Sequence, residues 1–241
     1  MKHFQMIIIN DLKRYFEYRI FHVHIAISIL FAASMAFFGS IHPSNFIFVA
    51  IFILPVVLFS ISLFIEREEG SILPWVSAPC SPTLIAVAKM TSALLMQLIP
   101  FVLFSIVLVL KGYEFSYLLF LLAFLLGSLV HIVIGLSLSI LSKSNQILSI
   151  SYLIYIVLFS VLPIFHANGL IPDRFSYALI ISPAYLSGIL IDSIMAGSLE
   201  SPVLLVILSV VLQLAYAAIL LRYVIAPFFK PYLLDSLGKK E

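Results

Sequence analysis

The sequence predicts an all-α integral membrane protein: six transmembrane helices follow an amphipathic interfacial helix, and partly re-entrant helices lie on the outer face between the fifth and sixth spans. Hydrophobic residues make up 63% of the 241 residues, whereas charged residues make up only 10%, against about 25% in an ordinary soluble domain. The apolar residues form long continuous runs, as membrane-crossing helices require. They do not alternate as the strands of a membrane barrel do.

The first 19 residues predict a helix that lies along the inner leaflet. Ile8, Leu12 and Phe16 recur at helical spacing. The charged side chains are expected to face elsewhere: Asp11, Lys13, Arg14 and Glu17. The other interpretation is a plain cytosolic extension of the first span. A cleavable signal is not expected, because the apolar run is short and no small-residue cleavage site follows.

Six later segments are each apolar over about the 20 residues that a bilayer crossing needs. They are 20–38, 46–65, 84–110, 116–141, 147–165 and 201–221. Residues 1–241 therefore form a single transmembrane domain, with a polar loop at 66–82 and a tail at 222–241. The chain has one cysteine, Cys80, which excludes an internal disulfide.

The distribution of Lys and Arg predicts the orientation of these spans. Of the 13 such residues, only Lys111 and Arg174 fall on one side of the six-span topology, which leaves 11 on the other. By the positive-inside rule, the side with 11 is cytoplasmic. The loop 66–82 and both termini are then cytosolic, and the protein is a multi-pass protein of a bacterial-type cytoplasmic membrane.

Residues 174–195 are apolar enough to be taken for a seventh span. A crossing there would move Arg222, Lys230, Lys239 and Lys240 to the other side and reduce the asymmetry to 7 against 6. Pro183 in the middle, with Asp173 and Asp192 near the ends, also disfavours a crossing. Residues 166–200 are therefore expected on the outer face, partly re-entrant into the membrane.

The sequence predicts no catalytic residue and no metal site. The sequence contains no H-E-x-x-H, no G-x-S-x-G and no Walker G-x-x-x-x-G-K-[ST] motif. All carboxylates fall in loops, tails or interfacial ends, so the midplane acids typical of ion-coupled carriers are absent as well. A transporter of this kind would take its energy from another polypeptide.

His131 is the one ionisable residue well inside a predicted span. Because Ser128 lies three residues earlier on the same helix face, the pair could form a nucleophile and base or a proton relay. The preferred interpretation is a neutral histidine hydrogen-bonded across a helix interface, since no second ionisable group lies at that depth.

The segment E-R-E-E-G-S, at 66–71, places dense charge between two apolar spans. Gly70 is expected to end the second span and Ser71 to cap a short new helix. Trp75 is expected to be exposed on that helix, which Pro79 and Pro82 would end before the third span.

This pattern resembles the permease subunits of the type-2 class of ABC exporters. The matching positions are Glu66, Glu68, Gly70, Ser71, Pro79, Ser81 and Lys89. The resemblance extends to the amino-terminal helix, the six spans and the outer helices between the fifth and sixth. Two departures are Pro74, inside the expected loop helix where the family has a leucine-like residue, and Pro82, where a basic residue is common.

The resemblance implies that 66–82 is a coupling loop that fits a cleft in an ATPase subunit. It implies two copies of that ATPase, a second permease subunit, identical or related, and ATP and Mg bound in the ATPase rather than in this chain. Membrane lipid is the other expected partner, and no nucleic acid is. The cargo is expected to be hydrophobic or amphipathic, such as a drug, an antimicrobial peptide or a lipid-like molecule.

Two alternatives remain at this point: an intramembrane enzyme that depends on His131, and an ATP-independent channel or scaffold.

Overall fold

The computed structural model describes residues 2–38, 43–71, 80–167, 169–195 and 203–235, and every regular element within these ranges is helical. Six helices in them are long and apolar enough to cross a membrane. They are Ile20–Phe37, Pro43–Glu68, Pro82–Leu110, Tyr117–Leu141, Asn145–His166 and Val203–Leu234. The predicted all-helical, multi-pass membrane protein is confirmed at this level.

Three of the six spans contain a π-helical turn that divides the helix. The undivided helices are α1 (Lys2–Glu17), α2 (Ile20–Phe37), α6 (Pro82–Leu110) and α7 (Tyr117–Leu141). The second span is α3 (Pro43–Ile53), η1 (Leu54–Phe59) and α4 (Ser60–Glu68). The fifth is α8 (Asn145–Ile156), η2 (Val157–Val161) and α9 (Leu162–Ala167), and the sixth is α12 (Val203–Leu220), η4 (Leu221–Ile225) and α13 (Ala226–Asp235).

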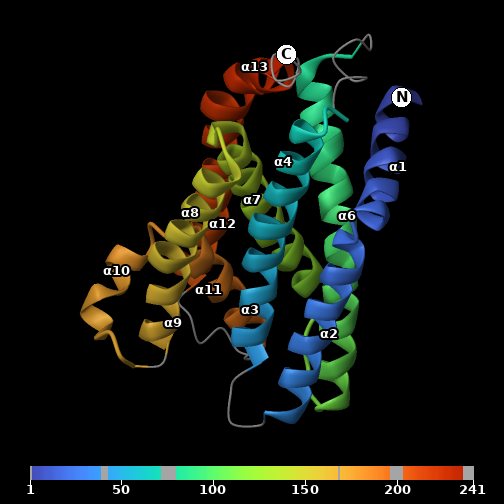
Figure 1. The fold of residues 1–241 in the computed structure, drawn as a ribbon. Coiled ribbons are helices and arrows are strands. Elements are labelled where there is room, and N and C mark those ends of the chain that lie inside the picture. The colour runs from blue at the N-terminus through green and yellow to red at the C-terminus, as the bar shows by residue number, and fades with distance from the viewer. Residues whose placement is uncertain (1, 39–42, 72–79, 168, 196–202, 236–241) are drawn as a thin grey trace.

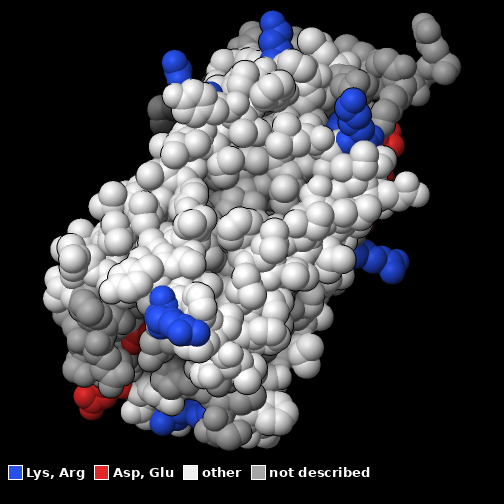
Figure 2. All heavy atoms as spheres, turned by 90° about the vertical axis from the view of Figure 1, so that its left-hand side faces the viewer, with Lys and Arg blue, Asp and Glu red and all other residues white. Residues whose placement is uncertain are grey.

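The amino-terminal end, the end of α4, the start of α6 and α13 all lie at the same end of the bundle (Figure 1). The side of the molecule formed by α8 to α10 is almost entirely uncharged, and its few charged side chains lie mainly toward the two ends (Figure 2). A surface of this kind suits contact with hydrocarbon, because no polar cover is needed there.

The region between the fifth and sixth spans holds only short helices: η3 (Asp173–Phe175), α10 (Ser176–Leu179) and α11 (Pro183–Met195). With 13 residues, α11 is about 20 Å long, whereas the hydrocarbon core is about 30 Å thick. It is too short for a seventh span. It packs against α3, α7 and α12, and its buried residues include Leu186 and Ile191. The re-entrant placement of 166–200 stays a prediction.

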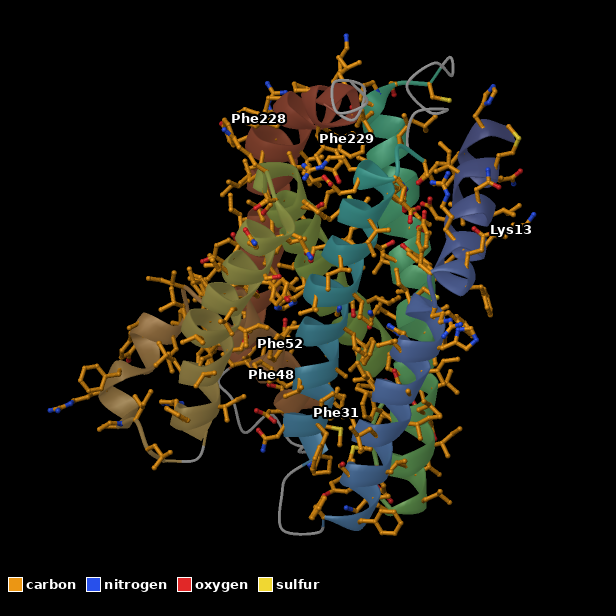
Figure 3. The ribbon with its side chains drawn as sticks, in the orientation of Figure 1. Lys13, Phe31, Phe48, Phe52, Phe228 and Phe229 are labelled. Carbon is orange, nitrogen blue, oxygen red and sulfur yellow. The ribbon has the colours of Figure 1, made fainter. Side chains whose placement is uncertain are left out.

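Two helices continue beyond the boundaries predicted for them. The second span continues to Glu68 rather than ending at Ile65, so Glu66 and Arg67 are buried helical residues. The tail after residue 221 is helical as far as Asp235 and bends across the end of the bundle (Figure 1). Its Phe229 points into the bundle and is 1% exposed, whereas Phe228 points outward (Figure 3).

α7 packs closely against the backbone of the π turn η1. A Cβ atom at Gly135 would lie 3.1 Å from the carbonyl oxygen of Pro55 and 3.2 Å from that of Val56. Proline has no N–H to donate and a π turn shifts the hydrogen-bond ladder, so carbonyls in this turn need other donors. Ser60 Oγ supplies one, since it donates to the Val56 and Val57 carbonyls. The glycine therefore lets α7 contact the backbone of η1.

We predict that Gly135→Ala lowers the stability of the protein by about 1–3 kcal/mol, because the new methyl group would press on backbone that cannot move aside. Thermal unfolding in detergent measures this as a lower midpoint. The matched control is Gly188→Ala in α11, where the nearest atom to the new Cβ would be a Phe48 ring carbon at 3.5 Å, an ordinary contact. Equal effects of the two substitutions would contradict the prediction.

Candidate functional site

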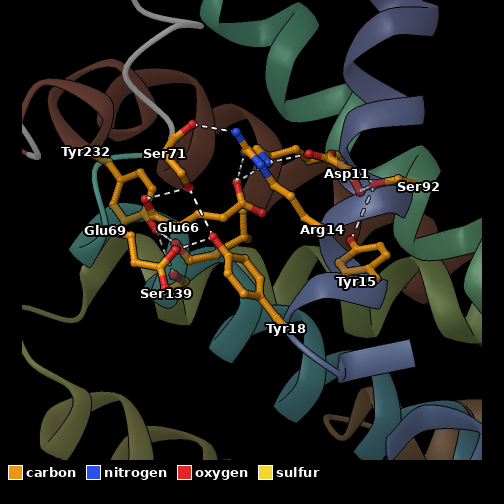
Figure 4. A network of polar contacts seen from close by, with 12 residues as sticks. Asp11, Arg14, Tyr15, Tyr18, Glu66, Glu69, Ser71, Ser92, Ser139 and Tyr232 are labelled. Carbon is orange, nitrogen blue, oxygen red and sulfur yellow. Dashed lines mark hydrogen bonds and ion pairs between the residues drawn. The ribbon is translucent and has the colours of Figure 1, made fainter. Parts of the chain in front are cut away.

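Four charged side chains from three helices meet at the end of the bundle that carries the amino terminus (Figure 4). Lys89 of α6 donates to Asp11 Oδ1 of α1 at 2.9 Å and to Glu66 Oε2 of α4 at 2.6 Å. Arg14 Nη1, from the next turn of α1, donates to the same Glu66 oxygen at 3.1 Å. We call Asp11, Arg14, Glu66 and Lys89 the charge cluster.

The charge cluster is almost completely removed from solvent. The side chains of Asp11 and Lys89 are each 1% exposed and that of Glu66 is 2% exposed, while Arg14 reaches the surface at 17%. Two carboxylates balance two cations, so the cluster is neutral as a whole. Burying a charge costs several kcal/mol unless its partner and hydrogen bonds are complete, and here each charge has them.

Two hydroxyl groups extend the cluster along α1 and α6. Ser92 Oγ lies 3.1 Å from Asp11 Oδ2 and 2.8 Å from the Lys89 carbonyl oxygen. Tyr15 Oη lies 3.4 Å from Ser92 Oγ. Burial raises the pKa of the Tyr15 hydroxyl well above its usual value, and the negative charge of Asp11 adds to this rise. Tyr15 therefore stays protonated and available to donate toward Ser92.

The cluster also holds the start of the segment that follows α4. Arg14 Nη2 donates to the Ser71 carbonyl oxygen at 2.7 Å. Tyr18, which follows α1, donates to Glu69, and its hydroxyl lies 3.4 Å from Ser71 Oγ. Partial burial raises the pKa of Tyr18, and the hydrogen bond to Glu69 adds to the rise. The chain leaving α4 is thus fixed to α1.

The end of α4 is a Schellman motif. Ser71 N donates to the Glu66 carbonyl at 3.0 Å, and Gly70 N donates to the Arg67 carbonyl at 3.1 Å. Gly70 adopts φ +69°, the left-handed conformation that this motif requires and that glycine adopts most readily. Gly70 therefore ends the helix as the sequence predicted.

Arg67 fixes the opposite side of α4. Its Nη1 donates to the Ser142 carbonyl at 2.9 Å, at the C-terminal end of α7, where a cation also suits the helix dipole. The guanidinium carbon lies 4.5 Å from the ring centre of Phe64 and 5.0 Å from that of Tyr232 in α13. Tyr232 in turn donates to the Leu63 carbonyl at 2.8 Å. The end of α4 is therefore held by α1 and α6 on one side and by α7 and α13 on the other.

The residues predicted for the coupling loop occupy different environments. Glu66 and Lys89 are buried together, whereas Glu68 is exposed, with a side-chain exposure of 44%. Ser81 caps α6 by accepting from Leu84 N at 3.2 Å. Trp75 and Pro79 lie outside the described residues, as does the predicted helix after Ser71.

Sequence reasoning missed Asp11, Arg14, Ser92 and Arg67. The expectation that Asp11 and Arg14 face away from the apolar side of α1 was wrong, because both turn toward α6 and α4. The buried stripe of α1 is Ile7, Asp11 and Tyr15, while Phe16 is 50% exposed. The available signal was the spacing of Ile7, Asp11 and Tyr15 at four-residue intervals, with a lysine in the third span in need of a counter-ion.

His131 is fully buried in α7, but its hydrogen bond differs from the expected one. Its Nδ1 lies 2.6 Å from the Gly127 carbonyl of its own helix, rather than from a group across an interface. Its ring centre lies 6.0 Å from that of Phe52 and 6.1 Å from that of Tyr155. Among the described residues, neither His131 Nε2 nor Ser128 Oγ has a hydrogen-bond partner, so these two side chains do not form a nucleophile–base pair.

The described part of the chain contains no group of three or more His, Cys, Asp or Glu residues placed to hold a metal ion. The charge cluster links helices, and its two carboxylates are already bound to cations. Comparison of the chain with family models, with curated proteins and with solved structures gave no match.

We predict that Lys89→Met destabilises the protein by about 3–5 kcal/mol, because it leaves two buried carboxylates with one cation between them. Adding Glu66→Gln to this variant should restore part of the loss, since the remaining Asp11 and Arg14 charges balance. Thermal unfolding in detergent measures both effects.

Lys13→Met is the matched control, because Lys13 lies on the same helix as Asp11 and Arg14 but points away from the bundle (Figure 3). It should change stability by less than about 0.5 kcal/mol. If Lys13→Met and Lys89→Met had similar effects, the charge cluster would not hold these helices together.

Proposed function

We propose that the chain is the membrane-spanning permease subunit of an ATP-driven exporter of the type-2 ABC class. A separate ATPase subunit binds the segment 69–81 at the cytoplasmic side, and two permease subunits with two ATPases form the complete transporter. ATP and Mg are bound in the ATPase.

The observation that carries this proposal is the charge cluster, together with its position. It joins α1, α4 and α6 directly beside the segment whose sequence resembles a coupling loop. A loop that transmits force must be attached firmly to the elements it moves. Here Ser71, near the start of the segment, is bound to Arg14. The helix after the segment begins at Pro82, two turns before Lys89.

The structure favours different roles for the residues that resemble the family pattern. Because Glu66 and Lys89 bind each other inside the bundle, we assign them to force transmission between α4 and α6 rather than to contact with the ATPase. Glu68 is exposed at the surface, and we assign it and Trp75 to the contact with the ATPase. Gly70 sets the direction in which the chain leaves α4.

The proposed orientation places both termini and the segment 69–81 in the cytoplasm, with α1 along the inner leaflet. Support comes from the sequence asymmetry of Lys and Arg and from the common location of the amino terminus, the end of α4 and α13 at one end of the bundle (Figure 1). We propose a hydrophobic or amphipathic cargo, since the spans are rich in apolar side chains and poor in charge.

The direct test is affinity purification of the full chain in mild detergent, followed by identification of accompanying chains and measurement of phosphate release from ATP. We expect a Walker-motif ATPase to accompany the chain and to hydrolyse ATP. A chain that purifies alone and functions in reconstituted vesicles without any ATPase would overturn the proposal.

We predict that Gly70→Ala alters ATP hydrolysis by the purified complex, with a change of about two-fold or more. An alanine in the left-handed conformation costs roughly 1–2 kcal/mol, which is enough to redirect the loop. Phosphate release per complex, at equal amounts of bound ATPase, is the measurement.

The matched control is Gly112→Ala in the turn between α6 and α7. Gly112 has a similar φ of +76°, and a Cβ there would meet nothing within 4 Å. It lies at the other end of α6 from the coupling segment. Alanine at Gly112 carries the same free-energy cost of a left-handed backbone. If both variants change ATP hydrolysis equally, the cause is a general loss of stability and not a role of the loop.

A further inference from the structure

A long groove lies between α7, α11 and α12, with a volume of about 710 Å³. α7 contributes Leu119, Leu122 and Leu126 to its wall, and α12 contributes Val206 and Val210. Leu119 and Leu122 are each 55% exposed, so the groove is open along its side. Two of its walls, α7 and α12, belong to helices long and apolar enough to span the membrane, so we take the medium at its open side to be hydrocarbon.

The groove has the depth of one leaflet. Its α7 wall runs from Ser116 to Leu126, ten residues apart, which is about 15 Å along a helix. The hydrocarbon core is about 30 Å thick, so each leaflet contributes about half of that. α7 begins at the end of the bundle where α6 finishes, far from α1, and the groove thus lies in the leaflet away from the charge cluster.

Among the described residues that line the groove, the charge is negative only. Glu114 lies at the rim with Ser116 and Ser193, and no Lys or Arg is among the described residues that line the groove. The nearby Lys111 directs its ammonium to the Met35 carbonyl of α2, at 2.7 Å. The start of α7, capped by Ser116, adds a partial positive charge close to the Glu114 carboxylate.

We propose that this groove binds a phospholipid whose head group carries a primary ammonium, namely phosphatidylethanolamine. One acyl chain lies along α7 between α11 and α12, the ammonium contacts the Glu114 carboxylate, and the phosphate lies near the first turn of α7. A head group with a negative net charge is disfavoured by the same carboxylate.

The groove is large enough to hold a lipid chain. At about 30 Å³ for each methylene-sized group, 710 Å³ holds roughly twenty such groups, which is enough for one acyl chain.

The experiment reconstitutes the full chain with equal amounts of phosphatidylethanolamine, phosphatidylcholine and phosphatidylglycerol and extracts it in mild detergent. Native mass spectrometry then counts the lipids that remain bound. We expect one phosphatidylethanolamine for each chain. Glu114→Gln should reduce its preference over phosphatidylcholine by roughly two- to five-fold, the effect of a partly exposed ion pair.

Val206→Phe narrows the groove and should reduce the retention of all three lipids. Val211→Phe is its matched control, because Val211 is 54% exposed on the same helix and does not line the groove. Glu17→Gln, an exposed carboxylate on α1, is the control for the loss of charge. If Val206→Phe fails to fold, the head-group preference of Glu114→Gln decides the question.

Three results would overturn the proposal. These are no retained lipid, a preference for phosphatidylglycerol, and equal retention in the Val206→Phe and Val211→Phe proteins, which would indicate annular lipid only. None of these measurements uses an ATPase, so the lipid site and the proposed exporter function succeed or fail separately.

Discussion

The ion pairs of Lys89 with Asp11 and Glu66 are the interaction on which the rest of this structure depends. A lysine that is 1% exposed cannot keep its charge without compensation, and the two carboxylates that supply it come from α1 and α4. If either helix separates from α6, a buried charge loses its partner. Separating the three helices therefore costs a large free energy. Arg14 binds both Glu66 and the Ser71 carbonyl, and it thereby holds Ser71 where the helices meet.

The remaining elements of that end of the bundle reinforce this arrangement. Arg67 binds the carboxyl end of α7 and lies over Tyr232 of α13, so a single stretch of α4 contacts four other helices through polar and aromatic groups. Further into the bundle, Gly135 allows α7 to approach the backbone of η1. A displacement of the segment after α4 would therefore be passed to α6 and α7 as a movement of packed helices, which is the form of coupling that the proposed exporter needs.

The other half of the bundle differs in chemistry. Its polar contacts include the hydrogen bond of Ser187 in α11 to Gln213 in α12, at 3.2 Å. The groove beside α7 is apolar over most of its length and carries its charge at one end, at Glu114. One end of the molecule is thus held together by charged and polar side chains, and the other has an open, mostly apolar groove. His131 lies between them as a buried side chain bonded to its own helix.

The sequence by itself determined the class of the protein, the number of spans and the helix break at Gly70, because these follow from local composition, run length and backbone preference. It also marked Glu66 and Lys89 as residues of interest, through the resemblance of the loop. Only the tertiary structure decided what they contact, since the partners of Lys89 are 78 and 23 residues away in the chain. The role of Asp11 was missed for the same reason: an acid on an amphipathic helix is expected to face solvent unless a buried cation lies against it.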